Sequence, residues 1–202
     1  MPIKDLRWHR PRRLINKPPS SVDVVRTNSR AARQPLINMT NGASKSYLGT
    51  AGELRAASEL SLRGYVAHIP TVDEGADLWA VDHGNGIGKR IQVKTSAYPN
   101  LTKIEGFICY QISIDSAILA STDISLVIYI YAFGDWQCYV TTAPQLQALR
   151  GNSKSTTVLL VLDDQGRVTV GGKGGGLLDP YRDAWDAEFP VLEGTSALAY
   201  AA

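Results

Sequence analysis

The feature that most restricts the fold of this chain is one helical pattern followed by a long series of short strand patterns. Apolar residues recur at helical spacing over 46–62, and Gly64 follows as a stop signal. The later runs are rich in Val, Ile and Tyr and are bounded by Gly, Asn, Asp or Pro, which is typical of strands. They cover 65–69, 77–81, 90–95, 107–114, 124–133, 136–141, 156–162 and 167–170. The predicted fold class is therefore α/β, with a helix followed by a sheet.

Two helices and a tight turn are predicted in the second half of the chain. Residues 144–150 and 179–188 have helical patterns, and in the second Asp179 is the expected N-cap, with Pro180 at the first helical position. Gly134 and Asp135, between two strand patterns, are typical of a hairpin turn. We therefore expect a core over 46–150 and a C-terminal hairpin and helix over 151–202, packed on that core.

The charge of the chain is divided unevenly. Residues 1–45 hold ten Lys or Arg and two Asp or Glu, a net charge of +8, whereas the rest of the chain holds 11 and 17, a net charge of −6. The first segment also contains five prolines and no periodic apolar pattern, so we expect a disordered basic arm. Its cations can neutralise nucleic-acid phosphates, or the segment can be an acid-poor targeting peptide. The residues leave both readings open.

Cysteine count and hydropathy exclude several classes of protein. Cys109 and Cys138 are too few for a disulfide framework or a four-cysteine zinc site, and both lie in apolar runs, so we expect buried free thiols. No apolar run approaches the roughly 20 residues that a spanning helix needs. No apolar segment follows Arg12 and Arg13, so an export signal is not expected and the predicted location is cytoplasmic.

Four polar residues are predicted to meet at one corner of the fold. Glu53 lies on the first helix and Asp77 opens a strand, while Gln92 and Lys94 lie two residues apart on the next strand and so share a face. If these strands pair as antiparallel neighbours through the loop at 83–88, Asp77 lies beside Lys94. The helix then brings Glu53 over the same edge.

Such a cluster suits a hard cation, because Mg²⁺ binds oxygen ligands and keeps several waters. A metal ion flanked by Lys94 can stabilise the charge that grows on a phosphoryl group while a bound water attacks. In the alternative reading, Asp77 and Lys94 form a cross-strand ion pair, and Glu53 is a helix-start charge favoured by the dipole. The spacing alone favours neither reading.

The same residues resemble the PD-(D/E)XK nuclease superfamily. The resemblance consists of Gly-x-x-Gly-Glu ending at Glu53, Gly-x-Asp ending at Asp77, and Gln-Val-Lys ending at Lys94, in this order, and it spans about 47–114. The sequence is similar above all to the branch with group I intron homing endonucleases and Holliday-junction-resolvase-like proteins. The resemblance implies a restriction-endonuclease-like fold, with a mixed β-sheet flanked by helices.

The resemblance also implies a role for each residue. Asp77 would be the central metal ligand, Glu53 the helix-borne acidic ligand, and the carbonyl of Val93 a further ligand, while Lys94 would orient or activate the attacking water. Gln92 stands where the superfamily usually has Asp or Glu, so the site holds one negative charge fewer. The implied activity is Mg²⁺-dependent hydrolysis of double-stranded DNA by a homodimer, with Mn²⁺ as a substitute. The alternative is a nucleic-acid-binding protein of the same fold without turnover.

Overall fold

A computed structural model describes residues 42–71, 75–97, 99, 107–151, 153–171 and 175–192. By its internal contacts the chain divides into Met1–Asn38 and Met39–Ala202, and every described residue belongs to the second unit. The predicted basic arm therefore lies outside the described residues, except that 42–45 already form the start of the first helix.

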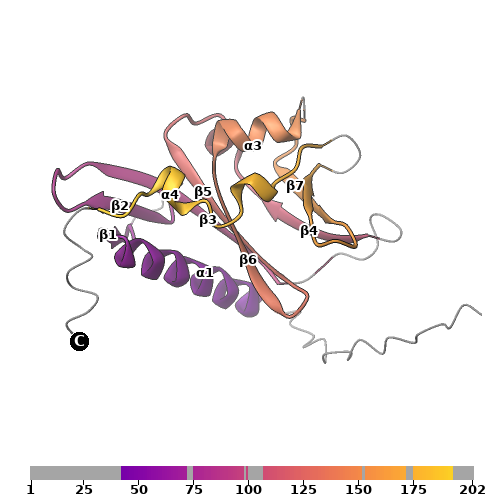
Figure 1. Ribbon diagram of the computed structural model, residues 1–202, viewed down its shortest axis with the longest axis horizontal. Helices are drawn as coiled ribbons and strands as arrows, with labels where there is room; N and C mark the ends of the chain where they lie inside the picture. Colours follow the sequence, from indigo (N-terminus) through magenta and orange to yellow (C-terminus); the bar gives the residue numbers. More distant parts are fainter. Residues whose placement is uncertain are drawn as a thin grey trace, which may run out of the picture. The chain divides into compact units, whose positions relative to one another are not determined.

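A five-stranded mixed sheet forms the centre of this unit, in the order β1–β2–β3–β5–β6 (Figure 1). β3 and β5 are parallel, whereas all other neighbours in this sheet are antiparallel. The prediction of a mixed sheet flanked by helices is thus confirmed. The strands are β1 Tyr65–His68, β2 Leu78–Asp82, β3 Gly88–Ser96, β5 Ile124–Ala132 and β6 Asp135–Thr142.

The turn between β5 and β6 lies one residue earlier than predicted. Ala132 pairs with Asp135, so the two loop residues are Phe133 and Gly134, with φ of 55° and 89°. A two-residue hairpin whose loop residues both have positive φ matches the right-handed twist of the flanking strands. Asp135 is therefore the first residue of β6 and not part of the turn.

A second, three-stranded antiparallel sheet contains β4 Ile108–Ser113, β7 Thr157–Leu162 and β8 Val168–Val170. The strand patterns in the sequence do not distinguish this sheet from the central one. β4 belongs to the connection between β3 and β5, because a parallel pair cannot be joined by a tight turn. The predicted C-terminal hairpin, β7–β8, pairs with β4 rather than with the central sheet.

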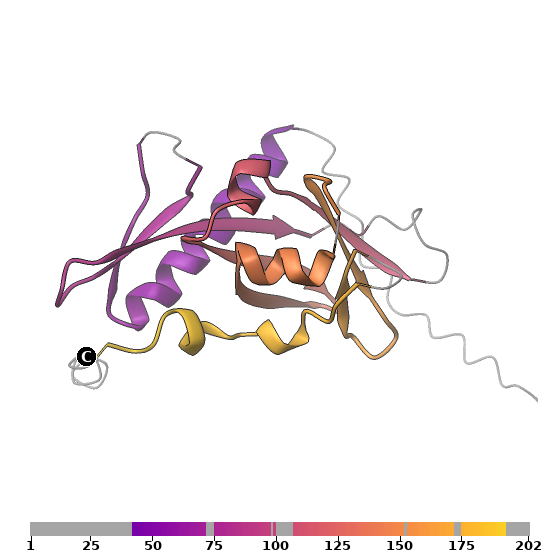
Figure 2. The ribbon, with the colours of Figure 1, turned by 90° about the horizontal axis from the view of Figure 1, so that it is seen from above.

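Helices cover both faces of the central sheet. α1, Gly42–Leu62, begins four residues earlier than predicted and packs Ala56 and Leu60 on one face. α3, Ala143–Arg150, packs on the opposite face, and its capping box is formed by Thr142 and Gln145. Figures 1 and 2 show the sheet between these two helices. A short helix, α2 Ser116–Leu119, lies between β4 and β5 in the chain.

The C-terminal segment is not the single helix predicted over 179–188. It forms a 3₁₀ turn, η1 Asp179–Tyr181, and a short helix, α4 Trp185–Glu188. Asp179 is not an N-cap, because its carboxylate accepts a hydrogen bond from the Val168 N–H at 3.1 Å and so binds the turn to β8. Arg182 is extended and pairs with Tyr139 as an isolated bridge, which interrupts the helix and covers the edge strand β6.

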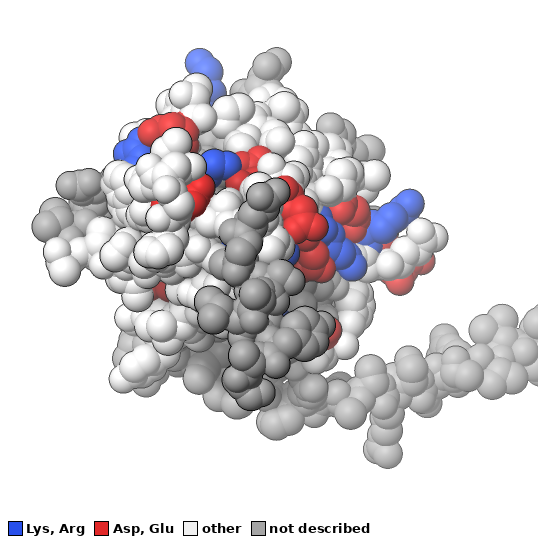
Figure 3. All heavy atoms as spheres, turned by 60° about the vertical axis from the view of Figure 1, so that its left-hand side comes forward, with Lys and Arg blue, Asp and Glu red and all other residues white. Residues whose placement is uncertain are grey.

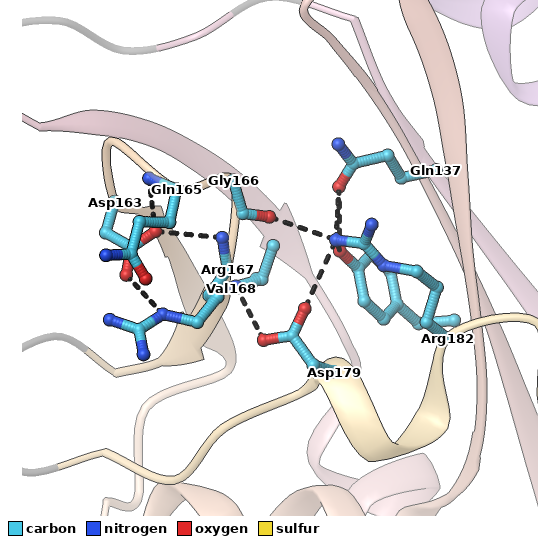
Figure 4. Close-up of polar contacts among 9 residues, drawn as sticks. Gln137, Asp163, Gln165, Gly166, Arg167, Val168, Asp179 and Arg182 are labelled. Atoms are coloured by element: carbon cyan, nitrogen blue, oxygen red, sulfur yellow. Dashed lines mark hydrogen bonds and ion pairs between the residues drawn. The ribbon is translucent and has the colours of Figure 1, made fainter.

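Arg182 fixes this segment to two parts of the fold (Figure 4). Its guanidinium donates to Gln137 Oε1 at 3.2 Å, to the Tyr139 hydroxyl at 3.1 Å and to the Gly166 carbonyl at 3.0 Å, and it also pairs with Asp179. The turn that carries Gly166 is itself closed by the Asp163 carboxylate, which accepts from two backbone N–H groups and from the Arg167 guanidinium.

Two predictions about cysteines and hydropathy can be compared with the described residues. Cys109 and Cys138 are both buried and neither forms a disulfide, as expected. Within the described ranges, no helix is long and apolar enough to cross a membrane.

Candidate active site

α1 approaches β3 closely at Gly52, and this contact places Glu53. A Cβ atom at Gly52 would overlap Thr95 Oγ1 and would lie 3.2 Å from Thr95 Cβ and 3.4 Å from Val93 Cγ1. Only a residue without a side chain allows the helix to lie this near the sheet. The Gly-x-x-Gly-Glu pattern is thus explained by packing at its second glycine, which is followed directly by the acidic residue.

We predict that Gly52→Ala lowers the free energy of unfolding by about 1–3 kcal/mol, because the added methyl group overpacks the contact with Thr95. Gly49→Ala is the matched control, since its methyl group would meet only Glu53 Oε1, at 4.0 Å. That control should gain about 1 kcal/mol, as Ala is the better helix former. Urea unfolding of both variants measures the two effects, and equal effects would contradict the close-contact explanation.

Asp77 is held at the point where the β2–β3 ladder ends. Leu78 pairs with Ile91, and the Asp77 N–H donates to the Ile91 carbonyl at 2.9 Å. Beyond that pair β3 continues without β2, so the Val93 N–H donates to Asp77 Oδ2 at 2.7 Å instead. Gln92 Nε2 donates to the same oxygen. One oxygen of the carboxylate therefore has two donors, which fixes its orientation.

The predicted register between these strands is two residues off. The ladder places Asp77 opposite Gln92 rather than beside Lys94, because the hairpin closes between Val81 and Gly88. A shift of two residues keeps every side chain on its face, so Asp77, Gln92 and Lys94 still share one face of the sheet. The opposite face of β3 carries Val93, which packs in the same hydrophobic cluster as α1.

Glu53 lies within range of the charges of this group. Burial raises the pKa of the Glu53 carboxyl, the carboxylate of Asp77 raises it further, and the ammonium group of Lys94 lowers it. Glu53 comes from the helix on one face, whereas Asp77 and Lys94 lie on the other, so the cluster straddles the end of β2. The structure thus joins Gln92 to Asp77 by a hydrogen bond and places Glu53 within the influence of the Asp77 and Lys94 charges, whereas their joint role as one site stays a prediction.

The cross-strand ion pair of the alternative reading is not present. Lys94 forms no ion pair with any carboxylate in the part of the chain that the structure describes. The hydrogen bonds to Asp77 come from Gln92 and Val93. Gln92 is only 4% exposed, so its hydrogen bond to Asp77 satisfies a buried polar group rather than a surface one.

The donor set fits a hard cation and does not fit zinc. Over the described ranges, no group of three or more His, Cys, Asp and Glu is placed to hold a metal ion, so the cluster offers two carboxylates and one amide. Mg²⁺ is commonly bound by one or two carboxylates and keeps its waters. A cation would also relieve the repulsion between Glu53 and Asp77 that raises the Glu53 pKa. The roles of Gln92 Oε1 and the Val93 carbonyl as ligands stay predictions.

Two features of the cluster were missed by sequence reasoning. The Val93 backbone contributes its N–H to Asp77, which depends on where the β2 ladder ends. Thr95, the residue after Lys94, forms the contact that admits α1 at Gly52. The small residue before Glu53 was the signal for that contact, but nothing in the sequence identifies its partner strand position.

Comparisons with known proteins add a distant likeness. No family model matches the sequence, and no curated protein is similar to it. Among solved structures, a bacterial homing endonuclease, I-Ssp6803I, is similar at a TM-score of 0.48 and 18% identity, over 78% of this chain and 97% of that chain. A likeness of this extent does not by itself assign an activity to this chain.

Proposed function

We propose that this chain is a metal-dependent endonuclease that hydrolyses phosphodiester bonds of double-stranded DNA. The observation that carries the proposal is the arrangement of Glu53, Asp77 and Lys94 at the end of β2. Burial and then the Asp77 carboxylate raise the pKa of the Glu53 carboxyl, the Lys94 ammonium group lowers it, and among the described residues Lys94 is in no ion pair. These groups can bind a divalent cation and stabilise a phosphate at one place.

Glu53 and Asp77 would hold Mg²⁺, or Mn²⁺ in its place, and Gln92 Oε1 and the Val93 carbonyl would add further oxygen donors. A bound Mg²⁺ lowers the pKa of a coordinated water and stabilises negative charge on a phosphoryl group. The bond from Gln92 to Asp77 Oδ2 leaves Oδ1 as the oxygen with no hydrogen bond from any described residue. Asp77 is therefore oriented before a cation arrives.

Hydrolysis forms a bond between a water oxygen and phosphorus and breaks one phosphorus–oxygen bond of the backbone. Negative charge grows on the phosphoryl oxygens as this happens. The ammonium group of Lys94 stabilises that charge or orients the attacking water, and a preorganised charge of this kind typically contributes a factor of about 10²–10³ in rate. The amide nitrogen of Gln92 positions Asp77, and its oxygen would be the group that faces the metal ion.

The distribution of charge supports DNA as the substrate, with the arm as its main contact. Acidic and basic side chains lie next to one another on the face shown in Figure 3, and much of that face is uncharged. The first 45 residues, in contrast, have a net charge of +8. Phosphate contacts position a protein on DNA without specifying sequence, so an arm of this charge fits that role.

A cut through both strands of a duplex needs two such sites, so we propose that two copies of the chain act together. Sedimentation of the protein with and without a DNA duplex tests this. A monomer in both states would restrict the activity to nicking.

One observation favours a second candidate, a DNA-binding protein of the same fold without turnover. Gln92 takes the place of a carboxylate, and its amide satisfies Asp77 without any cation. The cluster can therefore be stable as a purely structural arrangement.

Metal titration separates the two candidates. We predict that Mg²⁺ or Mn²⁺ raises the melting midpoint of the full chain, since a ligand at 100 times its Kd stabilises the native state by about 2.7 kcal/mol. Asp77→Asn should abolish this shift, because it removes one of the two carboxylates. Supercoiled plasmid and branched DNA, incubated with the same ions, report cleavage. A shift without cleavage would favour the binding protein, and no shift at millimolar metal would overturn the metal site.

A further inference from the structure

A hollow of about 290 Å³ lies on the α1 face of the central sheet, beside the candidate active site. It is lined by Ala51, Gly52 and Arg55 of α1, Thr95 of β3, Tyr129 of β5 and Trp136 of β6. Thr95 is aligned with Tyr129 in the ladder, and Trp136 lies two residues before the partner of Tyr129, so these side chains share one face. We refer to it as the α1 hollow.

The α1 hollow contains one exposed cation, Arg55, and one accessible aromatic ring, that of Trp136, because Tyr129 is only 2% exposed. The Arg55 guanidinium lies 5.7 Å from the centre of the Tyr129 ring. Glu59, one turn further along α1, is already paired with Arg63 at 3.0 Å, and Arg55 forms no ion pair with an acidic residue of the described ranges. No acidic residue lines the hollow. Its surface thus suits a planar, electron-rich group.

A hydroxyl without a partner lies in the same wall. Thr95 Oγ1 is the one buried side-chain polar atom, among the residues that the structure describes, with no hydrogen bond. An unsatisfied buried group costs free energy, so such an atom in a native structure calls for an explanation. The contact with Gly52 covers this atom, so it reflects how tightly α1 packs on β3 here and is not a surface that a ligand can reach.

We propose that the α1 hollow binds an unpaired nucleobase of the DNA strand that lies across the candidate active site. Bases stack on aromatic rings and on the planar guanidinium of arginine, and every base also carries a polar edge. The volume lies just below the range of small-molecule pockets, which fits a single ring system. The hollow adjoins the site on the α1 face, where Gly52 directly precedes Glu53, whereas Lys94 lies on the opposite face of β3 from Thr95.

The hollow lies between a helix and the sheet, so a base enters it only after leaving the helical stack. Extrusion costs least for a base that is mismatched or already unpaired. The inference rests on the proposed function for its choice of DNA as the substrate, and it narrows that substrate to DNA with an unpaired base near the phosphate to be cut.

The test measures binding in EDTA, so it does not depend on cleavage. The probe is a duplex with one unpaired 2-aminopurine, whose fluorescence falls when the base stacks, compared with the fully paired duplex. We expect the full chain to bind the bulged duplex roughly tenfold more tightly and to quench its fluorescence. Trp136→Ala should remove the preference, since one base–aromatic contact corresponds to roughly 5- to 100-fold in affinity, whereas Trp136→Phe should keep it.

Two more variants make the test specific. Trp79→Ala is the matched control, because Trp79 is a similarly half-buried tryptophan that lines a different cleft. It should leave the preference unchanged. Thr95→Val removes a hydroxyl that lies under Gly52, out of reach of a base, so it should also leave the preference unchanged.

Several outcomes overturn the inference. These are equal affinity for the two duplexes, an equal loss in Trp79→Ala and Trp136→Ala, or displacement by inorganic phosphate but not by a nucleoside, which would assign a simple anion site. If the preference is found and no metal-dependent cleavage is seen, the proposed function fails and the base site stands. If cleavage is seen and the preference is not, the base site is overturned and the proposed function stands.

Discussion

Lys94→Ala should lower the rate of Mg²⁺-dependent DNA cleavage by at least about a hundredfold, because it removes the positive charge nearest the proposed metal site. The affinity of this variant for DNA in EDTA should stay within about tenfold of that of the unmodified protein, since only one of many cations is lost. Single-turnover cleavage of a plasmid measures the first effect, and a filter-binding titration measures the second. The thermal midpoint shows whether the variant is folded.

Lys89→Ala is the matched control for this experiment. Lys89 lies on the same strand, but its ammonium group donates to the Glu188 carbonyl at 2.6 Å and lies over the Phe189 ring, away from Asp77. Its cleavage rate should therefore stay close to that of the original protein. An equal loss of rate in both variants would indicate a general effect of charge and would contradict a specific role for Lys94.

Removing residues 1–38 should lower DNA affinity at 0.15 M salt by about a hundredfold or more and should flatten the salt dependence. This segment holds nine Lys or Arg and two Asp or Glu, and the cut precedes the first residue of α1, so the helix that carries Glu53 is kept whole. Each phosphate contact adds close to one unit to the slope of log K against log salt. Titrations at four salt concentrations measure that slope.

Replacing the nine Lys and Arg of residues 1–38 by Gln, in the full chain, is the control for chain length. It should reproduce the loss of affinity and of slope if charge is what the arm contributes. If the slope of log K against log salt is unchanged after residues 1–38 are removed, the arm does not bind phosphates, and the targeting-peptide interpretation is favoured.

Strand positions were predictable from the sequence because most strands here are short apolar runs between turn residues. β5 is the clearest case, since its residues are buried on both faces and read as one continuous apolar segment. The division into two sheets was not predictable. Nothing in the run that became β4 specifies whether its partner is a strand of the central sheet or β7.

The members of the candidate site were predictable, but their contacts were not. The period of two in a strand assigns Gln92 and Lys94 to one face, and a register error of two residues leaves that assignment intact. It does not decide which of them bonds to Asp77, because that depends on the exact closure of the β2–β3 hairpin. The prediction of a single C-terminal helix over 179–188 was wrong for a related reason. Asp179 and Arg182 form long-range bonds, to Val168 and Tyr139, that local helix signals do not include.

The passage from β3 through β4 to β5 has a kinetic consequence. The chain between the parallel strands β3 and β5 contains β4, which belongs to the other sheet, and the partner of β4 there is β7, which follows β5 and β6 in the chain. The strands of the two sheets therefore alternate along the chain, and neither sheet is built from one continuous segment. We therefore expect slow folding, dominated by contacts between residues distant in the chain, and a single cooperative unfolding transition that involves both sheets at once.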